Sequence, residues 1–402
     1  MATILDGKAQ QNLIDHLRAA AILHVVLFHV MFGMIRFGQP ADIPEFIDRM
    51  PVWLDFVWQP FPVDLVFLAS AFLLSVGLIY ERQTTGGIDL RRFYVRRVSR
   101  IVPLYWAAVL LFGLGSGATV TQILKSAAFV GYIVGDMNVV PVGWTMEVMM
   151  VVYLLLPFAV RALFRSRRPM LWITGGLAAS AALRLGYIWS TDEQFAWMPY
   201  EFFLTGSPSE AGFELYNRLW FRIAPFFVGL GLAWLFVLHR QRMETLANRH
   251  RLLLVLVGGV AFFASAFVPV HDPNSWLAAV MPKAEWFWKL YFGLAIPISS
   301  LAAAVLLWVG LVRGWGRSEA IARLTRPFSV NIFGIYLFHM PLLVIGALIT
   351  FQSADPTYLG QSSLLQVLTV WAITSALSLG LSAILMRVIE APAMRFLRNR
   401  FG

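Results

Sequence analysis

The sequence contains no cysteine and few charged residues. The absence of cysteine excludes disulfide frameworks, thiolate nucleophiles, zinc sites with cysteine ligands and S-palmitoylation sites. Charged residues make up 13% of the chain, whereas soluble domains carry about 25%. Apolar residues make up 59%, and the mean hydropathy is +0.70. A water-soluble protein is therefore excluded, and an integral membrane protein is expected.

Apolar runs of nearly the length of a membrane-spanning helix recur along the 402 residues. Such a helix needs about 20 residues to cross about 30 Å of hydrocarbon. A weaker stretch at 119–138 carries Lys125 and Asp136, and it is expected to be an interfacial or re-entrant segment. The predicted fold is an all-α bundle of about ten transmembrane helices, one domain over residues 1–402 with no fused soluble domain. The expected spans lie near 13–36, 60–80, 101–118, 142–160, 171–189, 218–238, 252–270, 287–311, 328–350 and 364–386.

The connections between these runs alternate in charge. One set holds 23 Lys and Arg residues: 1–12, 81–100, 161–168, 239–251, 312–326 and 387–402. The other set holds two: 37–59, 190–217, 271–286 and 351–363. Cytoplasmic loops carry the excess of Lys and Arg, so both termini are expected in the cytoplasm of a multi-pass protein of the cell (inner) membrane. Orientation in the lipid bilayer accounts for the net charge of +10, and nucleic acid is excluded as a partner.

Arg18 and His29 are ionisable residues within the first apolar run. They lie eleven residues apart, and at about 100° per residue both project from one helix face, roughly 16 Å apart along the axis. Ionisable side chains in a membrane span are costly and usually face the bundle interior. The alternative interpretation is that such a residue forms a structural ion pair, or lies at a helix end and extends its side chain to the membrane interface. His24 lies about 140° from His29 and is expected to be a packed helix residue.

Four further polar residues fall within or at the ends of other runs. Asp64 and Glu147 lie near the outer ends of the second and fourth runs, and Glu147 follows Trp144 closely. Arg222 is expected at the outer end of the sixth run and His339 in the middle of the ninth. This set suits proton transfer, and it suits an ion-coupled transporter equally well.

A basic stretch from Arg91 to Arg100 precedes the third run. It can serve as an orientation signal or bind anionic lipid. Guanidinium groups also bind phosphate oxygens in a bidentate manner, so the stretch suits a phosphate-rich ligand such as coenzyme A. No nucleotide-binding fingerprint and no HExxH-type spacing occurs in the sequence, and no metal is expected.

Seven segments, in order, resemble motifs of the acyltransferase-3 family of multipass membrane acyltransferases. The resemblance extends over nearly the whole chain. The sequence departs from the family pattern in two motifs: Ala71 stands where glycine is usual, and Met149 and Met150 stand where acids are usual. Glu147 is the acid available to replace them. The segments are IDHLRAAAILHVVLFH with Arg18 and His29, FPVDLVFLASAFLL, FYVRRVSRIVPLYW, WTMEVMMVVYLLLP, RIAPFFVGLGLAW, IYLFHMP and EAP.

The resemblance implies transfer of an acyl group, often acetyl, from cytoplasmic acyl-CoA to a hydroxyl of an extracytoplasmic or lipid-linked glycan or a glycolipid. His29 is then the general base, and a covalent acyl-histidine is an open alternative. A transporter or flippase for a glycan or small acid is the rival interpretation. The implied catalytic residues are His29, Arg18, Asp64 and Glu147. The implied donor-binding residues are Arg96, Arg97, Arg100 and Tyr105, and the implied substrate-binding residues are Trp144, Arg222 and His339.

Overall fold

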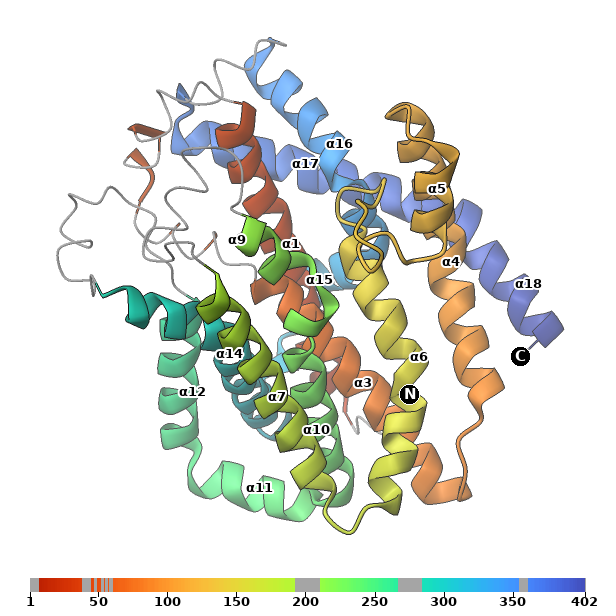
Figure 1. Ribbon diagram of the computed structural model, residues 1–402, viewed down its shortest axis with the longest axis vertical. Helices are drawn as coiled ribbons and strands as arrows, with labels where there is room; N and C mark the ends of the chain where they lie inside the picture. The colour runs from red at the N-terminus through yellow and green to blue at the C-terminus, as the bar shows by residue number, and fades with distance from the viewer. Residues whose placement is uncertain are drawn as a thin grey trace.

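A computed structural model of the chain describes residues 7–37, 45–46, 49–51, 54, 57, 61–191, 210–266, 284–353 and 361–401. These residues are largely helical, and no strand occurs among them (Figure 1). The longer helices are α1 (Lys8–Phe37), α3 (Phe61–Thr85), α4 (Leu90–Gly115), α6 (Trp144–Arg165), α7 (Pro169–Ser190), α14 (Glu285–Arg313), α16 (Ile332–Phe351) and α17 (Leu364–Leu385). The shorter ones are α5 (Val120–Ala127), α9 (Glu210–Asn217), η4 (Leu219–Phe221), α10 (Ala224–Leu238), α11 (Arg240–Arg249), α12 (Arg251–Ala266), η5 (Trp315–Arg317), α15 (Glu319–Val330), η7 (Met386–Glu390) and α18 (Ala391–Phe401).

The predicted all-α multi-pass membrane fold is confirmed. Eight helices among the described residues are long and apolar enough to cross a membrane. The pair α11 and α12, bent by 88°, makes a ninth if it is one span, and α10 is an apolar helix of 15 residues. Each predicted run thus contains a helix, although α10 and α12 are shorter than a straight crossing requires. Residue 60 and residues 267–270 of the predicted spans lie outside the described residues.

Three of the arginine-rich connections lie together at one end of the bundle. Helix α11 and the turns that join α3 to α4 and α6 to α7 lie at the bottom of Figure 1, whereas α5 lies at the top. This arrangement agrees with the alternation of charge along the sequence. The cytoplasmic location of the basic end remains a prediction.

Two helices extend beyond the predicted spans, because charged residues continue them into the interface. Helix α4 begins at Leu90, so the arginine stretch forms its first turns and not a loop. The side chain of Asp89 caps this helix by accepting a hydrogen bond from the backbone N–H of Arg92. At the other end of the chain, α17 continues through a π-helical turn, η7, into the basic helix α18.

Helices α3 and α10 pack closely at the centre of the bundle. A Cβ atom on Gly229 would lie 2.7 Å from the Cβ of Ala71 and 2.7 Å from the carbonyl oxygen of Leu68. Only glycine therefore permits this approach. Ala71 is buried against this glycine.

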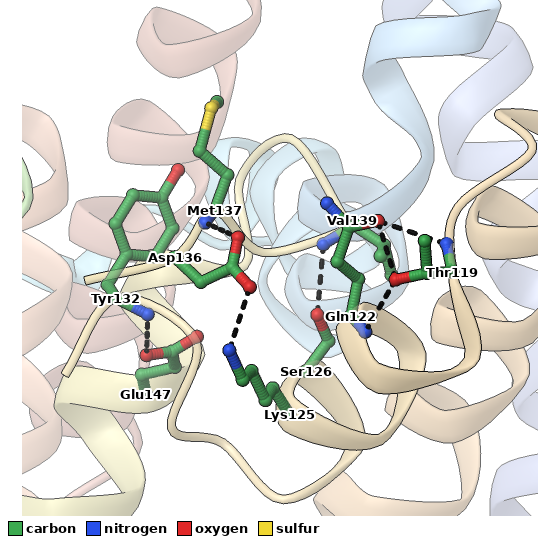
Figure 2. Close-up of polar contacts among 9 residues, drawn as sticks. All are labelled: Thr119, Gln122, Lys125, Ser126, Tyr132, Asp136, Met137, Val139 and Glu147. Carbon is green, nitrogen blue, oxygen red and sulfur yellow. Dashed lines mark hydrogen bonds and ion pairs between the residues drawn. The ribbon is translucent and has the colours of Figure 1, made fainter. Parts of the chain in front are cut away.

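The segment 119–143 leaves α4 and returns to α6 at the same end of the bundle. It contains only the eight-residue helix α5, which is too short to cross a membrane, in agreement with the predicted interfacial or re-entrant segment. Figure 2 shows how the return is held: Lys125 lies 3.1 Å from Asp136, and the Ser126 hydroxyl accepts from the backbone N–H of Val139 at 3.0 Å. The absence of a side chain at Gly143 leaves room for Asn138, because a Cβ at position 143 would lie 2.3 Å from the Asn138 side chain.

Candidate active site

His29 on α1 and His339 on α16 lie in contact. Nε2 of His339 is 3.2 Å from Nδ1 of His29, and the ring centroids are 4.7 Å apart with the rings inclined at 61°. Each ring also bonds a backbone carbonyl of its own helix: His29 Nδ1 bonds Val25 at 2.8 Å, and His339 Nδ1 bonds Tyr336 at 2.7 Å. His339 is completely buried, whereas His29 is partly exposed. Two residues that the sequence placed in separate spans thus form one histidine pair.

The packing of α1 against α15 and α16 fixes this pair. Ser329 donates to Asp15 at 2.6 Å toward the inner end, and a Cβ on Gly33 would lie 3.2 Å from Leu343 one turn beyond the histidines. These contacts succeed one another in the same order along both segments, so α1 and α16 run parallel. The pair therefore belongs to an interface that is held on both sides.

His24 lies apart from this pair, as its helix position predicts. Its Nε2 is 3.2 Å from the carbonyl oxygen of Val57, and its ring packs edge-on against Phe61. These contacts secure the chain that leads into α3, which is a structural role.

Three arginines converge toward the inner end of the same face of α1. Arg18 lies within electrostatic range of Arg97, Arg100 and the buried Tyr153 of α6. Arg97 and Arg100 are three residues apart on α4 and so share one face. Arg18 and Arg97 form no hydrogen bond or ion pair with any described residue, and Arg100 is 3.8 Å from the carboxylate of Glu390. The arrangement is a cationic site with little internal compensation.

Arg96 and Tyr105 occupy different surroundings from Arg97 and Arg100. Arg96 is exposed and lies near Arg92 and Arg398 at the rim of the bundle. Tyr105 is completely buried; its hydroxyl donates to the carbonyl of Ser126 at 3.2 Å and accepts from Asn138 at 2.7 Å. The structure thus separates the predicted donor-binding residues into an inward group, a rim residue and a support of the 119–143 segment.

Asp64 and Arg222 form a buried ion pair toward the other end of the bundle. NH1 of Arg222 is 3.4 Å from Oδ2 of Asp64. The guanidinium also lies 5.2 Å from the ring centroids of Trp144 and Tyr216, which pack against each other. Neither oxygen of Asp64, and neither Nε nor NH2 of Arg222, has a hydrogen-bond partner within the described residues. Such unsatisfied buried groups are costly, so the pair is suited to binding hydroxyl groups or water.

Arg184, which the sequence analysis overlooked, holds the backbone beside that pair. Pro297 in α14 has no N–H, which leaves the carbonyl of Gly293 without its helical partner, and Nε of Arg184 donates to it at 3.3 Å. NH1 of Arg184 donates to Phe221 at 2.9 Å, at the break before α10. Arg222 directly follows Phe221, so its position depends on the hydrogen bonds that Arg184 makes to these two carbonyls. The sequence feature that could have identified Arg184 is its position as an arginine within an apolar run.

Glu147 does not contact His29 and instead anchors the 119–143 segment. Its Oε1 accepts from Nδ2 of Asn138 at 2.8 Å. Its Oε2 accepts from the backbone N–H of Tyr132 at 2.9 Å, as Figure 2 shows. Asn138 also bonds Tyr105, so a single amide joins two residues that the sequence assigned to different roles. This bond network fixes the return segment over the start of α6.

A pocket opens between the return segment and η4. It is small and open to the surface, and Trp144 and Glu147 contribute to its wall. Arg218 donates to the carbonyl of Tyr132 across it and pairs with Glu214, which raises the pKa of the Arg218 guanidinium. The pocket thus combines aromatic faces, a carboxylate and a cation. Its other lining residues are Tyr132, Ile133, Val148, Asn217, Leu219 and Trp220.

Tyr336 connects this outer region with the histidine pair. Its backbone carbonyl accepts a hydrogen bond from His339, and its side chain lies near that of Thr145, the residue after Trp144. The ring centroids of Tyr336 and His339 are 5.9 Å apart. A continuous set of contacts therefore runs from the pocket wall to the histidines.

The model of the acyltransferase-3 family, described as an acyltransferase domain, matches residues 12–387. This range contains both histidines, the three inward arginines and the buried ion pair. The chain belongs to this acyltransferase family. No curated protein and no solved structure matches it.

Family membership makes the chain a membrane acyltransferase, which implies an acyl donor and an acceptor. Among the residues that the structure describes, no group of three or more His, Asp or Glu side chains could hold a metal ion.

Proposed function

We propose that the protein is an O-acyltransferase of the cell (inner) membrane that moves an acyl group, most simply acetyl, from cytoplasmic acyl-CoA to a hydroxyl of an extracytoplasmic or lipid-linked glycan. The observation that carries the proposal is the position of His29 between two different sites. Unpaired arginines lie toward one end of its helix face, and an aromatic pocket with a buried ion pair lies toward the other.

The inward arginines support a donor that carries phosphate groups. Arg18 and Arg97 have no carboxylate partner within the described residues, and Arg100 has only a distant one. Guanidinium groups bind phosphate oxygens with charge-assisted hydrogen bonds. Coenzyme A has phosphates at one end and a thioester at the other, so its phosphates bind these arginines while its arm extends toward His29.

The reaction then proceeds at His29. The Nε2 lone pair takes the proton of the acceptor hydroxyl while the hydroxyl oxygen attacks the thioester carbonyl carbon. The new C–O bond forms, the C–S bond breaks, and the departing thiolate takes the proton back from His29. The products are an ester and free coenzyme A, and His29 returns to its starting state.

The acceptor side is supported by the pocket and by the ion pair behind its wall. Aromatic rings such as Trp144 stack on the apolar faces of sugars, and carboxylate, amide and guanidinium groups bind hydroxyls. Asp64 and Arg222 offer four unsatisfied buried polar atoms in the same region. A hydroxylated acceptor matches this composition better than an apolar one.

The test is acyl transfer by the purified protein in lipid nanodiscs, with radiolabelled acetyl-CoA and a glycan extract of the cell envelope. Release of coenzyme A is read with a thiol reagent, to which the protein contributes no background because it has no cysteine. We expect label in the glycan, and a loss of at least ~10²-fold in His29→Ala. His24→Ala should transfer normally. Flux of glycan without thioester cleavage would favour a transporter and contradict the proposal.

A further inference from the structure

His339 contacts the proposed base directly, and the hydrogen bonds of the pair determine where its protons lie. A carbonyl oxygen only accepts hydrogen bonds, so a ring nitrogen close to one must carry a hydrogen. Nδ1 of His339 is 2.7 Å from the carbonyl of Tyr336 and 3.2 Å from that of Ile335. The neutral His339 ring therefore carries its proton on Nδ1, which leaves a lone pair on Nε2.

The same argument applies to His29. Its Nδ1 is 2.8 Å from the carbonyl of Val25, so Nδ1 carries the proton and Nε2 carries the lone pair. Nε2 of His339 faces this Nδ1–H at 3.2 Å and accepts from it. If His339 were the donor instead, Nδ1 of His29 would carry a lone pair. That lone pair would face the lone pairs of the Val25 carbonyl oxygen, which is repulsive.

We infer that His339 is a positioning residue that selects the reactive tautomer of His29. The inference rests on the proposed function, in which His29 is the general base. Two acceptors, the Val25 carbonyl and Nε2 of His339, hold the proton on Nδ1 of His29. Nε2, which makes no hydrogen bond with any described residue, is thereby left free to take the proton of the acceptor hydroxyl. After that transfer, the same two acceptors stabilise the positive charge on the His29 ring.

The surroundings hold the His339 ring in place. His339 is completely buried, its ring is fixed by two carbonyls of its own helix, and Tyr336 packs against it. The contact between Gly33 and Leu343 one turn away keeps the two helices at this separation. A neutral second histidine thus performs the orienting task that a carboxylate performs in a serine hydrolase, where the wrong tautomer costs about 10⁴-fold in kcat.

The test compares His339→Phe, which fills the space without an acceptor, with His339→Gln, whose amide oxygen can accept from Nδ1–H of His29. Acetyl transfer to the envelope glycan extract and release of coenzyme A are measured in nanodiscs at varied acetyl-CoA concentration. We expect His339→Phe to lower kcat by about 10²-fold or more with the KM for acetyl-CoA within about threefold. The kcat of His339→Gln should be at least about tenfold higher than that of His339→Phe. His24→Phe and His24→Gln, on the same helix as His29, are the matched controls and should differ little from each other.

Equal activity in His339→Phe and His339→Gln would overturn the inference, and so would a raised KM with unchanged kcat. Binding of coenzyme A to each variant shows whether it is folded; if His339→Phe does not bind, the comparison of His339→Gln with His339→Asn decides. We expect the longer amide to be the more active, because it reaches the position of Nε2. Failure of the proposed function is separate: the wild-type protein would then release no coenzyme A, or His29→Ala would transfer normally.

Discussion

Arg222 lies 3.4 Å from Asp64 in a part of the bundle from which solvent is almost wholly excluded, and its guanidinium contacts two aromatic rings. A buried ion pair of this kind costs desolvation energy that its attraction barely repays. Its retention next to the pocket favours a role in binding over a role in stability.

A comparison of single and double variants separates these roles. Arg222→Met leaves the Asp64 carboxylate buried without a partner, and we expect a loss of about 3–5 kcal/mol of stability. The double variant Asp64→Leu with Arg222→Met should recover most of the thermal stability in detergent but little of the acyl transfer. Full transfer by the double variant would reduce the pair to a structural element.

The inward arginines should control the affinity for the donor. Arg97→Ala or Arg100→Ala should raise the KM for acyl-CoA by roughly 10- to 100-fold, because a charge-assisted contact of ~1.5–3 kcal/mol is lost. Lysine should restore only part of the affinity, because it lacks the bidentate fork. Arg96→Ala should have a smaller effect because Arg96 is exposed, and Arg92→Ala on the exposed surface of the same helix is the control. If Arg92→Ala and Arg97→Ala behave alike, the stretch is an orientation signal.

The 119–143 segment should govern the acceptor and not the donor. Glu147→Gln replaces one accepting oxygen with a donor that faces Asn138 or the N–H of Tyr132, at a cost of about 1–3 kcal/mol. We expect a higher KM for the glycan with an unchanged KM for acetyl-CoA. An increase in the donor KM would show that the segment acts at the cytoplasmic site.

Asp136→Asn in the same segment is the matched control and gives a dependence on pH. Lys125 donates to Asp136 and holds the pKa of this carboxyl below its usual range. The pair is therefore intact at neutral pH, and its contribution is lost only as the pH falls through the lowered pKa. Asp136→Asn should change transfer little, because exposed ion pairs contribute little. Transfer by the wild-type protein should show no step from this group between pH 8 and pH 5.

The predicted orientation can be tested with two serines that each cap a helix. Ser116 follows α4 and Ser166 follows α6, at opposite ends of the bundle. In intact cells a membrane-impermeant thiol reagent should label Ser116→Cys and not Ser166→Cys, and no native cysteine interferes. Labelling of Ser166→Cys alone would place the arginines outside the cell and remove the basis for a cytoplasmic donor.

The sequence predicted what depends on one helix at a time. Apolar runs and charge alternation gave the membrane fold, and the spacing of Arg18 and His29 gave a shared face. The partner of His29 could not be predicted, because helical periodicity indicates a face but not the neighbouring helix or its register. His339 is 310 residues away along the chain.

The same limit applies to Glu147 and Tyr105. Both stood in motifs, and neither motif shows that Asn138 joins them, because the return segment has no periodicity from which to infer a contact. Arg184 is different: its place in an apolar run was visible, and only its partner, a carbonyl freed by Pro297, required the structure.

The separation of the two histidines has a consequence for synthesis of the protein. At about 5–20 residues per second, the helix that carries His29 waits roughly 15 to 60 seconds before the helix that carries His339 is made. During that interval the nascent chain has its arginines and the proposed base in the membrane without the group that orients the base. Transfer at the full rate therefore requires that nearly the entire chain has been inserted, and a truncated product would consume acyl-CoA only slowly.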